Sequence, residues 1–317
     1  MAEGHAPPAA QDRQRGALRR RPTNRTEDQR NDRTPIVNQL ASLITDLHDE
    51  QTALDHIVTV FDNDDWNRPT PAEGWTSRHQ IAHLAFFDAA AQMSLTDPEA
   101  FAQQRRRADR DPDAYSIAVL EPLLALTSAQ LLDTWRQGRR SLLNAFRSTP
   151  AGTRHPWYGP SMSVASMVTA RLMETWAHGQ DVADTVGAIR PVTSRMEHIA
   201  RIACLAFPFS FVNRAMPVPD TGVRVRLSLP SGGTWEFGDD GLEDSVSGPI
   251  EDFCLVLTRR RHVADTTLVT SGPIAGEWMT VGQAYAGPPG PGRASGQFTR
   301  RTPLVSSAAQ NPQNPQD

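Results

Sequence analysis

Apolar residues recur at helical spacing along the first half of the chain. From Leu40 to Phe61 they follow one another at steps of three, four or seven residues, which places them on one face of a helix. We expect this helix to span residues 35–61, because Thr34 can cap it and Pro35 suits its first turn.

The same periodicity predicts three further long helices, over residues 76–95, 128–147 and 162–186. Thr127 and Gln130 form a capping box ahead of the second of these. Gly187 stands where a left-handed residue would end the last one. Four long amphipathic helices joined by loops are typical of a four-helix bundle.

Beyond Pro191 the pattern changes to alternation with a period of two. Residues 223–229 and 234–237, with a glycine turn between them, predict two short strands, and residues 244–247 predict a third. We expect these strands to form an antiparallel meander. The expected helices of this half span residues 194–207, 249–257 and 273–286. The predicted fold class is therefore α+β: a four-helix bundle followed by a small α+β domain.

Both ends of the chain are polar. Residues 1–34 and 304–317 contain few large apolar side chains, so burial there cannot offset the loss of chain entropy. We expect both to be disordered tails. The remainder then divides into a helical domain over residues 35–190 and an α+β domain over residues 191–303.

Composition narrows the classes of function. The 317 residues include 32 basic and 36 acidic side chains, and the net charge of −4 gives no argument for binding nucleic acid or an anionic membrane. Every basic residue is arginine, which excludes a lysine Schiff base and a Walker-type phosphate lysine. No apolar run is long enough to span a membrane, and we expect no secretion signal. Cys204 and Cys254 lie in apolar segments and are interpreted as buried free thiols, so we expect a cytoplasmic protein.

The strongest chemical signal lies on the last predicted helix of the bundle. Glu174 and His178 are four residues apart and share one face, so they can bind one divalent metal ion together or form an ordinary surface pair. His83 lies on the second predicted helix among apolar residues, as either a core residue or a ligand. If the two helices face each other, the three side chains form a His₂Glu site with an open position, which is typical of catalytic zinc.

Two separated motifs resemble those of a known family. Asn67-Arg-Pro-Thr-Pro71, Gly74-Trp-Thr76 and Ile81-Ala-His-Leu84 resemble the N-terminal domain of mycothiol-dependent maleylpyruvate isomerases, which belong to the DinB-like metalloenzymes. The segment from Arg171 to Asp181 resembles the second motif of that family. The resemblance implies Zn²⁺ as the expected metal, mycothiol as the thiol co-substrate, and three metal ligands: His83, Glu174 and His178.

The second half resembles the C-terminal part of an actinobacterial branch of the same set, which in some members is described as similar to a wyosine-base-formation domain. In the isomerases this part closes over the metal site and contributes an arginine to substrate binding. The resemblance therefore makes Arg259, Arg260 and Arg261 candidates for binding a substrate anion, because a guanidinium group suits a carboxylate. A solvated turn after a helix is the alternative.

Two further residues of the second motif could support the site. Asp181 could orient a ligand as a hydrogen-bonding carboxylate, or it could simply be exposed. Arg171 could pair with Glu174 or with Asp88.

These observations favour a divalent-metal enzyme that uses mycothiol in isomerisation or S-transfer on a small electrophilic substrate. A metal-binding protein without turnover and a metal-dependent hydrolase stay open as alternatives. His₂Glu sites also accept Ni²⁺, Fe²⁺ or Mn²⁺. The expected partners are a small-molecule substrate and a thiol, without nucleic acid or membrane, and the chain is expected to be a monomer or a homodimer.

Overall fold

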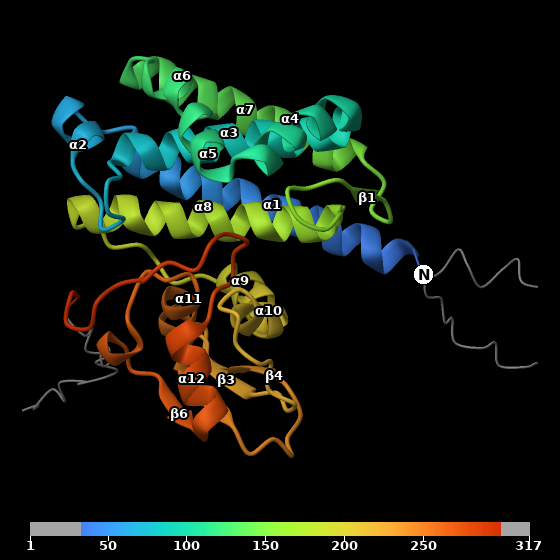
Figure 1. The fold of residues 1–317 in the computed structure, drawn as a ribbon, viewed down its shortest axis with the longest axis vertical. Coiled ribbons are helices and arrows are strands. Elements are labelled where there is room, and N and C mark those ends of the chain that lie inside the picture. The colour runs from blue at the N-terminus through green and yellow to red at the C-terminus, as the bar shows by residue number, and fades with distance from the viewer. Residues whose placement is uncertain (1–32, 299–317) are drawn as a thin grey trace, which may run out of the picture.

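The structure of the protein is a computed structural model that describes residues 33–298. Long helices form one part of the molecule, and a mixed helix-and-sheet part lies against them (Figure 1). Of the two predicted tails, only Arg33 and Thr34 fall among the described residues, where they begin the first helix.

Four long helices make up the first half: α1 (Arg33–Val58), α3 (Ser77–Thr96), α7 (Ser128–Ser148) and α8 (Val164–Val186). α3 packs against α7 and α8, and α1 packs against α8 and α7. The helical first half predicted from periodicity is thus confirmed. The capping box of Thr127 with Gln130 is present, and Gly187 ends α8 in the left-handed conformation with φ 68°.

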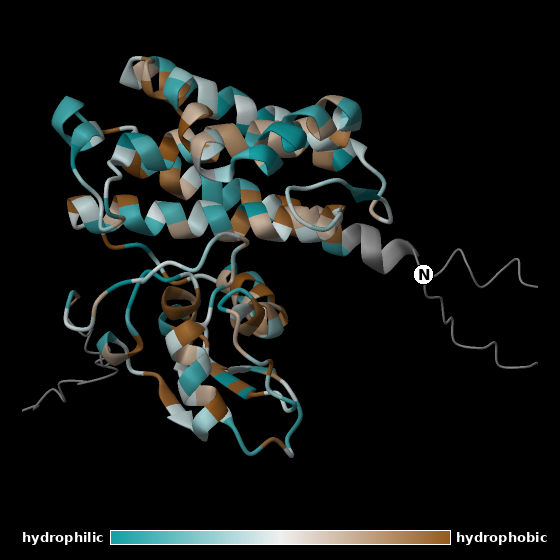
Figure 2. Cartoon of the chain, in the orientation of Figure 1, coloured by the Kyte–Doolittle hydropathy of each residue, from teal (hydrophilic) through white to brown (hydrophobic). Residues whose placement is uncertain are grey.

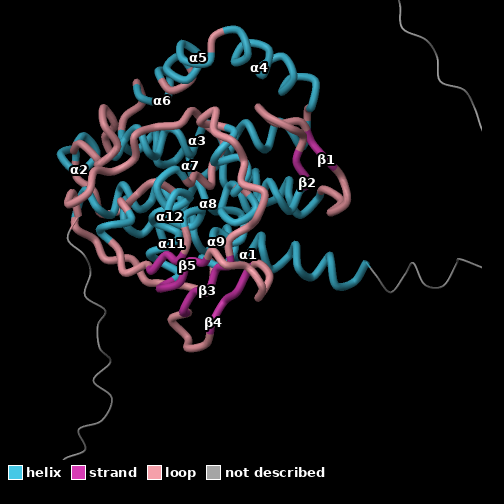
Figure 3. The backbone as a smooth tube through the Cα atoms, turned by 60° about the horizontal axis from the view of Figure 1, so that its bottom comes forward, coloured by secondary structure: helices cyan, strands magenta, loops and turns pink. Residues whose placement is uncertain are grey.

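Shorter elements connect these helices: α2 (Asn63–Asn67), α4 (Pro98–Arg110), α5 (Pro112–Ala118), α6 (Glu121–Leu124), β1 (Arg154–His155) and β2 (Met162–Ser163). β1 and β2 form a small antiparallel hairpin immediately before α8. α4, α5 and α6 lie on the side of the bundle that is farthest from the strands of the second half (Figure 3).

The second half contains α9 (Met196–Leu205), α10 (Phe207–Val212), β3 (Arg224–Ser228), β4 (Thr234–Phe237), β5 (Ser245–Pro249), α11 (Ile250–Leu257), the 3₁₀ turn η1 (Val263–Asp265), β6 (Val269–Ser271) and α12 (Pro273–Val281). The α+β class is therefore confirmed. The helix expected over residues 194–207 ends earlier because Pro208 suits the first turn of a new helix, α10.

The antiparallel meander predicted for the sheet is wrong. The strand order is β4-β3-β5-β6: β3 pairs antiparallel with β4 but parallel with β5, and β5 pairs antiparallel with β6, a strand that the sequence analysis did not predict. This order places Val246 of β5 beside Val225 of β3, and both side chains are fully buried. β5 then runs directly into α11, which covers this apolar face.

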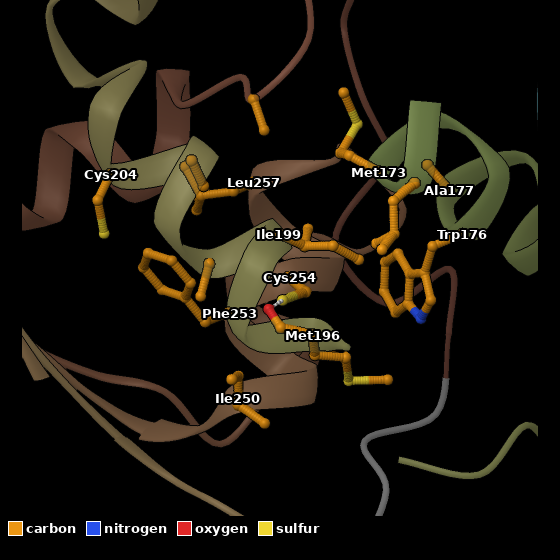
Figure 4. Close-up of a cluster of buried hydrophobic side chains, with 14 of the residues drawn as sticks. Met173, Trp176, Ala177, Met196, Ile199, Cys204, Ile250, Phe253, Cys254 and Leu257 are labelled. Atoms are coloured by element: carbon orange, nitrogen blue, oxygen red, sulfur yellow. Dashed lines mark hydrogen bonds between the residues drawn. The ribbon is translucent and has the colours of Figure 1, made fainter. Parts of the chain in front are cut away.

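Hydrophobic residues occur along the helices and strands of both halves (Figure 2), and most of the large ones are buried in two clusters. The larger of two buried clusters continues from one half into the other, and Figure 4 shows Trp176 and Ala177 of α8 in the same cluster as Ile199 of α9 and Phe253 of α11. The domain boundary predicted at residue 190 stays a prediction, and this core spans it. α8 is thus held from both sides.

Within residues 33–298, no single helix has both the length and the apolar character needed to cross a membrane. One pair of segments, Ala114–Leu124 with Ser128–Ser148, meets those criteria only when the two are joined across a bend of 113°.

Candidate metal centre

His83 of α3 and the pair Glu174 and His178 of α8 converge on one point. Each offers one ligand atom, and these atoms all lie within 4.8 Å of one another. Oε2 of Glu174 is 3.1 Å from Nε2 of His178 and 3.5 Å from Nε2 of His83. The structure therefore brings together the three residues that the sequence motifs single out.

A buried ion pair holds the two ligand-bearing helices together. Nε of Arg171 on α8 donates to Oδ1 of Asp88 on α3 at 2.9 Å, and both side chains are almost completely buried. Arg171 thus pairs with Asp88 and not with Glu174. At the start of α3, the backbone N–H of Thr76 donates to Nδ1 of His79 in a capping box, which fixes where the helix begins.

Gln80 fixes the orientation of the His178 ring. Its Oε1 lies 2.5 Å from Nδ1 of His178, and its Nε2 donates to Oγ1 of Thr70 at 3.0 Å. An amide oxygen only accepts hydrogen bonds, so Nδ1 of His178 carries the proton and Nε2 directs a lone pair towards Glu174. The sequence analysis missed Gln80, although its position three residues before His83 on the same helix was a usable signal.

With that tautomer, Nε2 of His178 and Oε2 of Glu174 are two acceptors facing each other, and a positive charge between them would satisfy both. Metal–ligand distances of about 2.0–2.2 Å place neighbouring ligand atoms of a tetrahedral zinc site about 3.3–3.6 Å apart. The observed 3.1 and 3.5 Å are close to this spacing. The residues therefore fit a divalent metal ion.

The protonation states also suit a cation. Burial lowers the pKa of His83, and it lowers the pKa of His178 to about 4. Burial alone would raise the pKa of Glu174, but the two neighbouring imidazoles outweigh this and hold the pKa well below its usual range. The site then offers two neutral imidazoles and one carboxylate, which are the forms that bind metals.

Aromatic rings enclose the cluster on the helical side. Trp75 lies 5.5 Å from the ring of His83 and stacks on His178 at 5.9 Å, and Phe87 lies 4.5 Å from His83. Trp157 continues this wall from Phe87. The side chains of His83 and Glu174 still keep about a fifth of their surface exposed, at 20% and 22%. The centre is therefore shielded from water on one side and open to a small ligand on another.

The three candidate arginines lie in the turn after α11, where the protein itself binds their guanidinium groups. Arg260 donates to the carbonyls of Ala177 and Thr258 and lies 3.0 Å from a carboxylate oxygen of Asp181. Arg261 forms a two-pronged pair with Asp184 at 2.6 and 2.7 Å. These two arginines join the second half to α8, and the positive charge of Arg260 acts to lower the pKa of His83 and of His178.

Arg259 is held differently. It adopts a left-handed backbone conformation with φ 64°, and its side chain donates to the carbonyls of Thr280 and Pro291. None of the three arginines presents a free fork to a substrate. Asp181 contacts Arg260 and, at 2.5 Å, Arg293, and not a ligand histidine.

A separate groove of about 300 Å³ lies between α3, α4 and α5, and its lining includes Phe86, Met93, Gln104, Arg107 and Tyr115. It shares α3 with the metal centre, but none of its lining residues belongs to the ligand cluster.

Comparisons with known proteins show which proteins the chain resembles. Residues 47–183 match the family described as "Mycothiol maleylpyruvate isomerase N-terminal domain". Uncharacterized protein MT0041 and Uncharacterized protein Rv0036c, from two strains of Mycobacterium tuberculosis, are each 41% identical to the chain over 250 residues, which is 79% of this chain and 97% of theirs. These relatives support an actinobacterial origin.

Two crystal structures of a mycothiol-dependent maleylpyruvate isomerase, one of them of a mutant, superpose with a TM-score of 0.50 at 19% and 18% sequence identity. The match covers 70% of this chain and 90% of theirs, and it shows a shared fold. The chain belongs to the DinB-like superfamily that includes the mycothiol-dependent maleylpyruvate isomerases. Within that superfamily, the mycobacterial proteins are similar to it over almost their whole length.

Proposed function

We propose that the protein is a divalent-metal-dependent enzyme of the cytoplasm that uses mycothiol to isomerise, or to conjugate, a small electrophilic substrate. The observation that carries this proposal is the cluster of His83, Glu174 and His178, in which acceptor atoms face one another with the spacing of a metal site. Zn²⁺ is the metal we expect, because imidazole nitrogens and one carboxylate suit it and its catalytic sites keep a position open.

A metal ion bound there would lower the pKa of a thiol that enters the open position, as zinc does for water. The residues around the cluster would support the binding of a metal ion and a thiolate in three ways. Gln80 holds His178 in the tautomer that offers Nε2, Glu174 supplies the negative charge, and Trp75 and Phe87 exclude water from the helical side.

The thiol must come from outside the chain. Cys204 and Cys254 are both buried, and burial raises the pKa of each thiol well above its usual range. An external thiolate would add to one carbon of an electrophilic carbon–carbon double bond, forming an S–C bond while the π electrons move onto the conjugated carbonyl oxygen. Rotation about the resulting C–C single bond and release of the same thiolate would complete an isomerisation, whereas protonation of the adduct would give an S-conjugate.

Hydrolysis is less well supported by the surroundings of the cluster. A metal-dependent hydrolase needs a general base beside the metal. Asp88, Asp181 and Asp184, which lie on the ligand-bearing helices, are each paired with an arginine. Each of these carboxylates is therefore bound by an arginine, which disfavours its use as a general base.

The proposal is tested by loading the protein with Co²⁺ and titrating it with mycothiol. We expect one metal ion per chain and a sulfur-to-cobalt charge-transfer absorption that grows with the thiol. His178→Ala should lose the metal, whereas His56→Ala, at an exposed histidine of α1, should keep it. One metal ion without a thiol-dependent band would instead indicate a metal-binding protein that does not use thiols.

A further inference from the structure

Two short helices, α4 and α5, arch over α3 on the side of the bundle that is farthest from the strands of the second half (Figure 3). Each of them begins at an aspartate that is followed by a proline. Asp97 accepts a hydrogen bond from the backbone N–H of Ala100, and Asp111 accepts one from that of Ala114, both at 3.0 Å. Because these caps start new helices, the chain turns twice and leaves a groove of about 300 Å³ between α3, α4 and α5.

The lining of this groove is part apolar and part polar. Phe86 and Met93 of α3 and Val119, which directly follows α5, supply apolar surface. Arg107 of α4 and Tyr115 of α5 supply polar groups. Such a combination suits a small molecule, because apolar contacts give affinity and a few placed polar groups fix the orientation.

Arg107 gives the groove a positive charge. Among the side chains that the structure describes, Arg107 forms no ion pair, whereas Arg105 on the same helix pairs with Asp109 at 3.6 Å. The whole of α4 carries four arginines against two acidic residues. A guanidinium group without a carboxylate partner favours an anionic ligand, and its planar fork matches a carboxylate or a sulfonate.

A chain of hydrogen bonds leaves a hydroxyl proton available at the same groove. Nε2 of Gln104 donates to the hydroxyl of Tyr158 at 2.5 Å, and the hydroxyls of Tyr158 and Tyr115 lie 3.3 Å apart. The Tyr158 oxygen accepts from Gln104, so its own proton can bond to Tyr115. Burial and the bond with Tyr115 raise the pKa of Tyr158, which agrees with this direction of donation. Within residues 33–298 the Tyr115 hydroxyl bonds to no other group, so its proton is left for a ligand in the groove.

An aromatic layer separates the groove from the metal centre. Phe86, which lines the groove, meets the edge of Phe87 at 5.0 Å, and Phe87 lies 4.5 Å from the ring of His83. None of the three candidate metal ligands lines the groove. A molecule bound in the groove would therefore occupy a site of its own.

We propose that the groove between α3, α4 and α5 is a second binding site, which holds a small amphipathic anion with its apolar body against Phe86 and Met93 and its carboxylate or sulfonate group on Arg107 and Tyr115. This site goes beyond the proposed function, because it needs neither the metal nor the thiol. It also assigns a ligand to α4 and α5, which carry none of the candidate metal ligands.

The test is a fluorescence titration of the full chain with 8-anilinonaphthalene-1-sulfonate, an aromatic anion that brightens in apolar surroundings. We expect one molecule to bind per chain. Arg107→Gln should weaken binding about fivefold, as loss of a solvent-exposed charge pair does, and Tyr115→Phe should weaken it as well. Arg106→Gln is the matched control, because it removes the same charge from the next position of α4, outside the groove, and should leave the affinity unchanged.

A neutral probe separates the charge from the apolar contacts. N-Phenyl-1-naphthylamine has the same rings without the sulfonate, and it should bind the wild type and Arg107→Gln equally. Equal affinity of Arg107→Gln and Arg106→Gln for the anionic probe would overturn the proposal.

Ala100→Trp tests where the probe binds. Ala100 lines the groove, and a tryptophan side chain there would fill it while the backbone bond to Asp97 is kept, so this variant should fold with the same helical content and bind no probe. An Ala100→Trp protein that binds the probe as the wild type does would refute the site. His178→Ala should bind the probe fully, whatever its metal content. Loss of probe binding in His178→Ala would instead place the anion at the metal centre, so the two proposals fail in different experiments.

Discussion

Asp88 of α3 and Arg171 of α8 form an ion pair of 2.9 Å inside the helical half, with side chains 0% and 2% exposed. His83 lies five residues before the first, and Glu174 three residues after the second. The pair therefore fixes the position of α3 against α8, and with it the separation of the candidate metal ligands.

Removal of one partner of this pair should cost stability. Arg171→Met leaves the Asp88 carboxylate buried without its counter-charge, which typically costs about 3–5 kcal/mol. We expect a correspondingly lower free energy of unfolding in urea and a lower metal affinity. Arg105→Ala, which removes an exposed pair with Asp109, should change the unfolding free energy by less than about 1 kcal/mol. Equal effects of the two substitutions would refute this role.

Gln80 should control metal affinity without being a ligand. Gln80→Leu removes the acceptor for Nδ1 of His178, and loss of such a partner typically lowers metal affinity about 10–100-fold. Gln80→Glu keeps an acceptor and should retain most of the affinity. Competition with a chromophoric chelator measures both, with Gln103→Leu on the exposed surface of α4 as a control. A Gln80→Leu protein with unchanged affinity would show that the tautomer of His178 is set in another way.

Asp55 should make stability depend on pH. Burial would raise the pKa of its carboxyl, but Arg136 and Arg139 outweigh burial and lower it. A lowered pKa means that the pair stabilises the fold above the unfolded-state pKa of about 3.9, and that this contribution is lost as the pH falls through the folded-state pKa.

The wild type should therefore exceed Asp55→Asn in unfolding free energy at pH 7, and the gap should narrow below about pH 4. Asp49→Asn, at an exposed position of α1, should show no such gap. Thermal unfolding between pH 3 and pH 7 checks this, and a gap that is constant across the range would contradict it.

The two cysteines should be unreactive in the folded protein. Cys204 is 5% exposed and Cys254 is fully buried, and burial raises the pKa of both thiols. Ellman's reagent should label neither over minutes under native conditions and both in denaturant. Rapid labelling of the native protein would mean that a thiol of the chain itself is available for chemistry.

The sequence was sufficient for features that depend on nearby residues. The spacing of Glu174 and His178 follows from helix geometry, and apolar periodicity located the long helices. Gln80 escaped notice because its partner His178 lies 98 positions away along the chain. The parallel pairing of β3 with β5 was missed for a similar reason, since a period of two predicts a strand but does not specify its neighbour. The arginine turn was recognised, but only the fold shows that Asp181 and Asp184 bind two of its side chains.

The core that runs from α8 into α9 and α11 has a consequence for how such a chain can diverge. A fragment ending at residue 190 would expose Trp176 and Ala177 to water (Figure 4), so the helical half is not a module that can be exchanged freely. α8 carries Glu174 and His178 on one face and packs on the second half with another, so the two faces move together as one helix. Substitutions at Ile199 or Phe253 can therefore shift Glu174 and His178 without touching them, so the geometry of this cluster depends on core side chains of the second half.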